Sequence, residues 1–175
     1  MKLTIRTTSA DETTALGERL GKQLRPGDVI ALFGDLGAGK TTLTNGIAVG
    51  LGLDADIHSP TFTLIHEHMG AVALYHVDLY RLSREQEVET LGLEEYIYSD
   101  GVTVIEWADK MKSMLPSQRL DITLRMRGDT ERELILESES ERMTRIIESL
   151  FSSLDKNHPA SSHRIKSHFL TMDEE

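Results

Sequence analysis

The fold of this chain is decided by the stretch Gly34-Asp35-Leu36-Gly37-Ala38-Gly39-Lys40-Thr41-Thr42. It matches the pattern of a phosphate-binding loop, in which Gly, any four residues and Gly-Lys-Ser/Thr follow one another. The apolar, partly β-branched run Val29 to Phe33 precedes it and predicts a strand buried on both faces. Residues 42–51 follow it and predict a helix. A loop of this kind between a strand and a helix indicates an α/β domain.

The residue types in this loop suit a phosphate site. Gly34, Gly37 and Gly39 can adopt backbone angles closed to other residues, so successive amide N–H groups turn inward and form a concave anion site. The start of the helix adds unpaired N–H groups and its positive dipole end. Lys40 would reach the β- and γ-phosphates of a nucleotide, and the Thr41 hydroxyl would ligate Mg²⁺. The alternative is a glycine-rich turn that only caps a helix. The register of strand, loop, Lys-Thr and helix favours nucleoside triphosphate binding.

Length and composition limit the class of protein. A chain of 175 residues is long enough for one α/β domain with a substantial core and short for two. It contains no cysteine, so disulfides and thiolate metal sites are excluded. Because it has no membrane-spanning apolar run and residues 1–6 do not look like a signal peptide, we expect a cytoplasmic protein. The formal net charge of −10 argues against nucleic-acid binding by this chain alone, so RNA would be reached through a partner.

Apolar periodicity and turn signals predict the remaining elements. Strands are expected at 2–7, 61–66, 71–78, 102–106, 120–126 and 132–137, with antiparallel hairpins joining 61–66 to 71–78 and 120–126 to 132–137. Helices are expected from Ser9 or Asp11 to about Gln23, and at 84–89, 93–98, 109–115 and 139–151. We expect residues 1–151 to form one domain and the polar segment 152–175 to be a disordered tail.

Two carboxylates end predicted strands, at the edge where open α/β sheets bind ligands. Glu106 follows the apolar run 102–105 and would bind Mg²⁺ directly or through water. The alternative is an ordinary cap or salt bridge. Asp78 ends the strand 71–77 and would orient water or bind Mg²⁺ through water. An Asp78–Arg81 ion pair that fixes the chain as it leaves the strand explains the same residues equally well.

Three further residues each have two interpretations. Thr61, in Ser59-Pro60-Thr61, sits where many P-loop hydrolases keep a γ-phosphate switch, or it belongs to a plain turn. Trp107 stacks near a base or fills the core, and composition slightly favours the core. His76 acts as a general base or is a packed, hydrogen-bonded histidine, and the second is favoured because no nucleophile lies near it in the sequence. The absence of an Asn-Lys-x-Asp element favours adenine over guanine.

Four motifs together resemble the TsaE family, the small P-loop ATPases of bacterial tRNA threonylcarbamoyladenosine biosynthesis. They are Gly-Asp-Leu-Gly-Ala-Gly-Lys-Thr-Thr at 34–42, Ser-Pro-Thr-Phe at 59–62, His-Val-Asp-Leu-Tyr-Arg at 76–81 and Ile-Glu-Trp at 105–107. Their order and spacing carry the resemblance, which covers about residues 1–150. The segment after Phe151 is longer than the family needs.

The resemblance implies a single P-loop domain with a mixed, mostly parallel sheet flanked by helices, and ATP and Mg²⁺ as cofactors. It also implies a complex with the proteins TsaB and TsaD, in which the ATPase supports repeated cycles of the transferase and meets tRNA only indirectly. By position, Thr41 and Glu106 match the Mg²⁺ ligands, and Lys40 with the loop glycines matches the phosphate site. Asp78 matches the acid of the Asp-Leu-Tyr-Arg motif implicated in hydrolysis, so Lys40 and Asp78 are the expected catalytic residues. The implied nucleotide contacts are Asp35, Leu36, Gly37, Ala38, Gly39, Lys40, Thr41, Thr42, Asp109 and Arg132.

Two other functions share the same loop. A small-molecule kinase would need an acceptor pocket and usually a basic lid, and the sequence has no Arg-rich segment of that kind. A nucleotide-sensing adaptor would use 59–62 to switch its affinity for a partner with little hydrolysis. We expect an ATP hydrolase that is slow alone, because no arginine finger or general base is evident.

Overall fold

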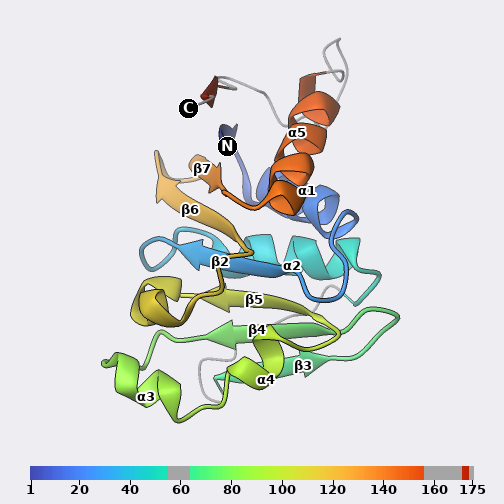
Figure 1. Cartoon of the computed structure of the whole chain (residues 1–175). Helices are drawn as coiled ribbons and strands as arrows, with labels where there is room; N and C mark the ends of the chain where they lie inside the picture. The colour runs from blue at the N-terminus through green and yellow to red at the C-terminus, as the bar shows by residue number, and fades with distance from the viewer. Residues whose placement is uncertain (55–63, 156–170, 174–175) are drawn as a thin grey trace.

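The computed structural model describes residues 1–54, 64–155 and 171–173, and it is built around one eight-stranded sheet with the order β3-β4-β5-β2-β6-β7-β1-β8 (Figure 1). The strands are β1 (Lys2–Thr7), β2 (Val29–Phe33), β3 (Ile65–His68), β4 (Leu74–Asp78), β5 (Val102–Glu106), β6 (Leu120–Met126), β7 (Arg132–Glu137) and β8 (Thr171–Asp173). The helices are α1 (Ala10–Gly21), α2 (Lys40–Gly50), α3 (Glu85–Glu89), α4 (Glu94–Ile97), the 3₁₀ helix η1 (Ala108–Met114) and α5 (Glu141–Asp155). The predicted α/β class is confirmed.

The middle of the sheet is parallel and its outer strands are antiparallel. β4, β5, β2 and β6 lie side by side in parallel. The hairpins β3–β4 and β6–β7 extend the sheet in the antiparallel sense, and β1 pairs with both β7 and β8. Both predicted hairpins are therefore confirmed.

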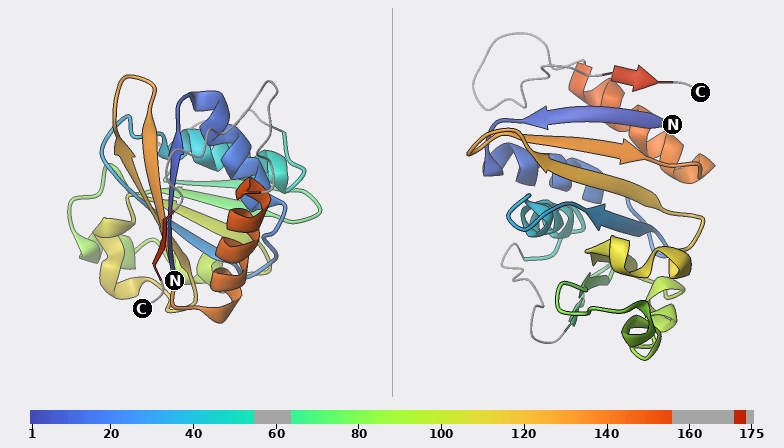
Figure 2. Two further views of the ribbon diagram at one scale, coloured as in Figure 1. Left: turned by 90° about the horizontal axis from the view of Figure 1, so that it is seen from above. Right: turned by 90° about the vertical axis from the view of Figure 1, so that its left-hand side faces the viewer.

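Apolar side chains pack on both faces of the sheet. Ile30 and Leu32 of β2 belong to a core cluster shared with α1, α2 and α5, whereas Val29 and Ala31 belong to a second cluster shared with α3, α4 and η1. Helices lie on both sides of the sheet in Figure 2. Because both faces of β2 are covered, its sequence is a continuous apolar run rather than an alternating one.

Helices α1 and α2 pack backbone against backbone through Gly17 and Gly21 on one side and Gly46 and Gly50 on the other. The glycines of each pair are four residues apart, so they share one face of their helix. A Cβ at Gly46 would lie 2.9 Å from the Gly17 Cα, and a Cβ at Gly21 would lie 3.0 Å from the Gly50 Cα. Only glycine allows this approach, which joins α1 closely to the helix that follows the glycine loop of residues 34–42.

Some element boundaries differ from the prediction. β3 begins at Ile65 because Leu64 has a φ of 65° and interrupts the extended backbone; residues 61–63 lie outside the described ranges. The helix predicted at 109–115 is a 3₁₀ helix that begins at Ala108, with a kink at Met111. Helix α5 runs from Glu141 to Asp155 instead of 139–151, since buried Leu154 continues its apolar stripe.

The predicted disorder of residues 152–175 falls mainly on positions that are not described. Of the described part, residues 152–155 continue α5, and β8 pairs with Lys2 to Thr4 of β1. The disorder of the remaining tail stays a prediction. Within the described ranges, no helix is both long and apolar enough to cross a membrane.

Candidate functional site

The glycine loop, residues 34–42, has the backbone conformation that its glycines predict. Gly34, Gly37 and Gly39 have positive φ angles of 136°, 77° and 101°. Gly39 is the N-cap of α2, so the first amides of this helix open onto the loop. Gly34 is needed for space as well, because its Cβ would collide with the backbone carbonyl of Leu124 on β6.

Lys40 lies back along the loop. Its Nζ donates to the carbonyl oxygens of Gly34, at 2.7 Å, and Asp35, at 2.9 Å. The same atom lies 3.8 Å from the centre of the Trp107 ring. Lys40 is buried. The Lys40 ammonium is thus held between the carbonyl oxygens of the loop and the face of the Trp107 ring.

Burial dominates the electrostatics of this ammonium. Desolvation lowers the pKa of Lys40 below its ordinary value of 10.5. The surrounding carboxylates oppose that shift and favour the charged form; in order of decreasing effect they are Glu106, Asp78, Asp109 and Asp35. The predicted residues Glu106, Asp78 and Asp109 therefore lie within electrostatic reach of Lys40.

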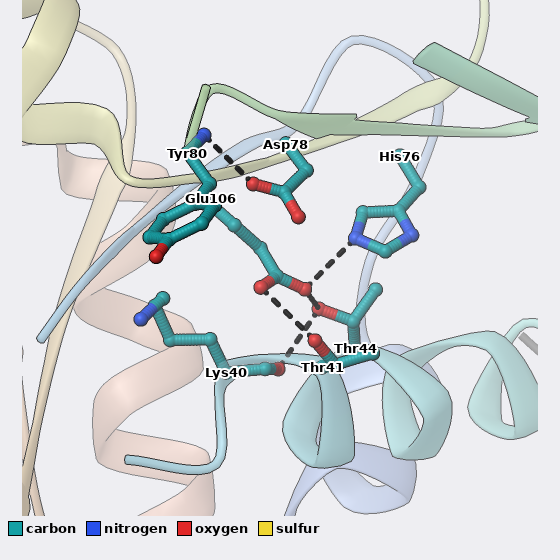
Figure 3. A network of polar contacts seen from close by, with 7 residues as sticks. All are labelled: Lys40, Thr41, Thr44, His76, Asp78, Tyr80 and Glu106. Carbon is teal, nitrogen blue, oxygen red and sulfur yellow. Dashed lines mark hydrogen bonds and ion pairs between the residues drawn. The ribbon is translucent and has the colours of Figure 1, made fainter. Parts of the chain in front are cut away.

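Glu106 is the most closely held carboxylate of the site (Figure 3). Its Oε2 accepts from the Thr41 hydroxyl at 3.1 Å. Its Oε1 lies 2.8 Å from His76 Nε2 and 3.3 Å from the Thr44 hydroxyl. Both Glu106 and His76 are buried. The structure thus brings together the two residues predicted as magnesium ligands, Thr41 and Glu106.

Asp78 lies directly beside Glu106 because β4 and β5 are parallel neighbours in which these two residues are register partners. Its Oδ1 accepts from the Tyr80 amide at 2.9 Å, which shapes the turn after the strand. The carboxylate is buried, and Figure 3 shows it between the Tyr80 ring and His76. Two buried carboxylates side by side, close to one buried ammonium, form a polar site within an apolar sheet.

Trp107 and Tyr80 cover this site. Trp107 has a left-handed φ of 58°, which redirects the chain immediately after Glu106. Its half-buried ring packs against the second core cluster and lies 5.1 Å from the Tyr80 ring, so it fills the core only in part; stacking near a base stays a prediction. The ammonium of Lys110 donates to the carbonyl oxygens of Tyr80 and Leu82 and thereby ties η1 to the turn after β4.

Arg132 supports the loop from β7. Its guanidinium donates to the carbonyl oxygens of Ala38, at 3.1 Å, and Gly37, at 3.2 Å. It also donates to the carbonyl oxygens of Gly128 and Glu131 in its own hairpin. The structure therefore places Arg132 against the loop, as a brace between β7 and the turn that carries the glycines.

The other predicted nucleotide contacts line the same edge of the sheet. Asp35 and Leu36 are exposed at the tip of the loop, and Thr42 is half-buried in the first turn of α2. Asp109 is exposed in the first turn of η1. Thr61, with Ser59 and Pro60, lies outside the described residues, so its predicted role as a γ-phosphate sensor stays a prediction.

The residues present fit a magnesium–triphosphate complex better than a metal held by protein alone. Among the described residues, no group of three or more His, Cys, Asp and Glu side chains is arranged to hold a metal ion. The site offers two hydroxyls, of Thr41 and Thr44, and two carboxylates, of Asp78 and Glu106, beside the first turn of α2. Mg²⁺ in triphosphate sites takes one or two protein oxygens and completes its octahedron with phosphate oxygens and water.

Sequence reasoning missed one residue of this network, Thr44, and the partner of another, His76. Thr44 follows Thr41 by three residues, so helical spacing alone places both hydroxyls on one face of α2. His76 was correctly predicted as a hydrogen-bonded histidine, but its partner was not, because the pairing with Glu106 depends on β4 and β5 being neighbours.

The chain is similar in sequence and in fold to known proteins. Residues 7–134 match the family model described as "Threonylcarbamoyl adenosine biosynthesis protein TsaE". The chain is 44% identical to the Bacillus subtilis tRNA threonylcarbamoyladenosine biosynthesis protein TsaE over 146 residues, 83% of this chain and 91% of that protein. It is 42% identical to the Treponema pallidum protein of the same name over 126 residues, 72% of this chain and 93% of the other. The crystal structure of Bacillus subtilis YdiB superposes with a TM-score of 0.74 at 39% identity, covering 87% of this chain and 96% of that one.

Proposed function

The chain belongs to the TsaE family, and from this premise we propose that it is a magnesium-dependent ATPase that serves the threonylcarbamoyladenosine modification of tRNA. The single observation that carries the proposal is the meeting of Lys40, Thr41 and Glu106 at one end of the parallel strands, beside the glycine loop. This is the edge at which open α/β sheets bind ligands. ATP is the proposed nucleotide.

Each of the predicted site residues has a role in the proposed hydrolysis. The loop amides and Lys40 bind the β- and γ-phosphates, and Thr41 with Glu106 would hold Mg²⁺. When bound, the metal ion neutralises charge on the phosphate oxygens. Asp78 orients a water molecule toward the γ-phosphorus. A bond from the water oxygen to phosphorus forms as the bond to the bridging oxygen of ADP breaks, and the water protons end on phosphate and solvent.

The surroundings of Lys40 support a site that is completed on binding. Lys40 is held by two loop carbonyls and the Trp107 ring, so a phosphate must compete with these contacts. Arg132 donates to the carbonyl oxygens of Ala38 and Gly37, so its guanidinium is committed to the loop. We therefore propose that turnover by the isolated chain is slow.

The proposed partners are the proteins TsaB and TsaD. In this proposal the chain hydrolyses ATP so that the TsaB–TsaD transferase can repeat its cycle, and it meets tRNA only through that complex. The net charge of −10 supports an indirect contact with RNA, since phosphate backbones are bound mainly through clustered Lys and Arg. We also propose that the protein is located in the cytoplasm.

Steady-state ATP hydrolysis with and without TsaB and TsaD tests the proposal. We expect turnover to rise when both proteins are added, and to fall strongly in D78N while MgATP still binds. Unchanged turnover on adding the partners would count against the ATPase role. Labelled γ-phosphate recovered on a metabolite instead of as inorganic phosphate would indicate a kinase. If D78A leaves release of the partners unaffected, the chain is a nucleotide-sensing adaptor.

A further inference from the structure

His76 occupies a position that the proposed reaction does not by itself explain. It lies on β4, two residues before Asp78, on the face of the sheet that packs against α2. Its side chain is fully buried, with a relative exposure of 0%. Its Nε2 lies 2.8 Å from Glu106 Oε1, the shortest hydrogen bond to that carboxylate among the described residues.

The other donors to Glu106 are weaker or committed elsewhere. The hydroxyl of Thr44 has a single hydrogen, and it lies 3.0 Å from the Lys40 carbonyl but 3.3 Å from Glu106 Oε1. The hydroxyl of Thr41 faces the other oxygen, Oε2, at 3.1 Å. His76 is therefore the principal donor to Oε1.

The surroundings of the imidazole identify which nitrogen carries the proton. The Nδ1 atom is buried and has no hydrogen-bond partner among the described residues. Oε1 of a carboxylate can only accept a hydrogen bond, so the ring nitrogen that faces it must donate. Nε2 therefore carries a proton, which makes His76 a donor to Glu106 Oε1.

We propose that His76 is a positioning residue: it anchors Oε1 of Glu106 so that Oε2 stays beside Thr41, where the pair is to hold Mg²⁺. This inference rests on the proposed function, because it assigns a role in metal binding at the same site. His76 does not touch the nucleotide, and it acts only through the carboxylate. Partners of this kind orient metal-binding side chains, and their loss commonly weakens metal affinity.

A matched pair of variants separates positioning from simple packing. Gln at position 76 can place an amide N–H close to the position of Nε2, whereas Asn is one methylene shorter and does not reach Glu106. We therefore compare H76Q with H76N. The control is H66N, which makes the same change on β3 at the register partner of His76.

The measurement is the dissociation constant of ATP by calorimetry, once with excess Mg²⁺ and once with a chelator. For the wild type we expect tighter binding with Mg²⁺. In H76N that gain should fall by about 10-fold or more, while binding in chelator stays unchanged because the loop and Lys40 are intact. H76Q and H66N should keep the wild-type gain. Near-ultraviolet circular dichroism checks that each variant is folded, and H76F replaces H76N if that variant does not fold.

The outcomes distinguish this inference from the proposed function. If the wild type gains nothing from Mg²⁺, the proposed magnesium site fails, and the role of His76 fails with it. If the wild type shows the gain and H76N keeps it, the site stands and the positioning role is wrong. If H76N and H76Q lose the gain equally, or if H76N weakens binding equally with and without Mg²⁺, His76 contributes packing alone, and the inference is again overturned.

Discussion

The two ends of helix α2 make opposite kinds of contact. At its first turns, Lys40, Thr41 and Thr44 face buried carboxylates and loop carbonyls across the edge of the sheet. At its last turns, Gly46 and Gly50 have no side chains and pack directly on the backbone of α1. The first turns of α2 carry polar side chains that are shielded from water, whereas its last turns, residues 46–50, carry no polar side chain.

This difference shows how the fold keeps a site in which the burial of charged groups is unfavourable in free energy. Burying an ammonium and carboxylates is unfavourable unless each is paired, and groups kept for binding are often held at some expense of stability. Close helix packing has no such conflict, because it brings many atoms into van der Waals contact. The glycine contact with α1 therefore holds α2 in place while its first turn carries the charges.

The largest effect is expected at the packing end. G46A places a methyl group 2.9 Å from the Gly17 Cα, and this methyl group also overlaps the Thr14 carbonyl oxygen. The two helices must therefore separate. We expect a loss of about 3 kcal/mol in the free energy of unfolding, measured by urea titration. The control is G128A, since a Cβ there would make ordinary contacts of 3.7 Å or more. A loss in G46A no greater than that of the control would contradict the close contact.

The second effect separates binding from stability at the other end of α2. K40M removes the charge from a buried site, and we expect ATP to bind about 10- to 100-fold more weakly, in keeping with the worth of charge-assisted hydrogen bonds. The free energy of unfolding should be unchanged or higher at neutral pH. K22M is the control, because Lys22 is an exposed lysine paired with Glu18. A K40M protein that is clearly less stable than the wild type would show that this end of α2 also stabilises the fold.

The same substitution predicts a pH dependence. The pKa of Lys40 is lowered by desolvation, so the folded state releases this proton at a lower pH than the unfolded chain, whose value is near 10.5. The cost to stability is fully present at neutral pH and disappears as pH rises through the folded pKa toward 10.5. Wild type should therefore gain stability relative to K40M over that alkaline range. Equal pH profiles in urea unfolding would contradict the buried, destabilising charge.

A smaller effect is expected at Arg132, which links the loop to β7. R132A should weaken ATP binding by about 5- to 10-fold, the equivalent of about one hydrogen bond, because the carbonyls of Gly37 and Ala38 lose their donor. R132K separates the effect of charge from that of hydrogen-bond geometry, because lysine keeps the positive charge but lacks the planar guanidinium with its fixed set of donors. If R132K restores binding, Arg132 acts on phosphate through its charge, and the bracing role is wrong. R119A, which removes an arginine paired with Asp121, is the control.

The smallest effect lies away from α2, at Glu133. A hydrogen bond from Arg127 lowers the pKa of this carboxyl, with Arg6 and Arg125 adding to the shift. Its contribution to stability is present above the unfolded pKa and is lost as pH falls through the lowered folded pKa. E133Q should unfold at slightly lower urea than wild type at pH 7 and at the same urea at low pH. E137Q, an exposed member of the same strand, is the control; an equal effect there would show no special role for Glu133.

The sequence is sufficient to predict most of this site. The loop is contiguous, and Glu106 and Asp78 end apolar runs, so the rule that parallel strands share a ligand-binding edge brings them together. The contact of His76 with Glu106 requires the order of the strands, which no local pattern encodes. The glycine spacings of α1 and α2 are visible in the sequence, but which two helices they join is a tertiary fact. The φ of Trp107, and hence its place over Lys40, likewise depends on packing.

The central claim is that a triphosphate binds at the charged end of α2, and the fluorescence of Trp107 tests it most directly. Trp107 is the only tryptophan of the chain, and its ring lies 3.8 Å from the Nζ atom that must turn toward phosphate. Titration with MgATP should change its emission with a saturable curve in the wild type and produce little change in K40M. If ATP binds by equilibrium dialysis without any change in Trp107 emission, or does not bind at all, the account is contradicted.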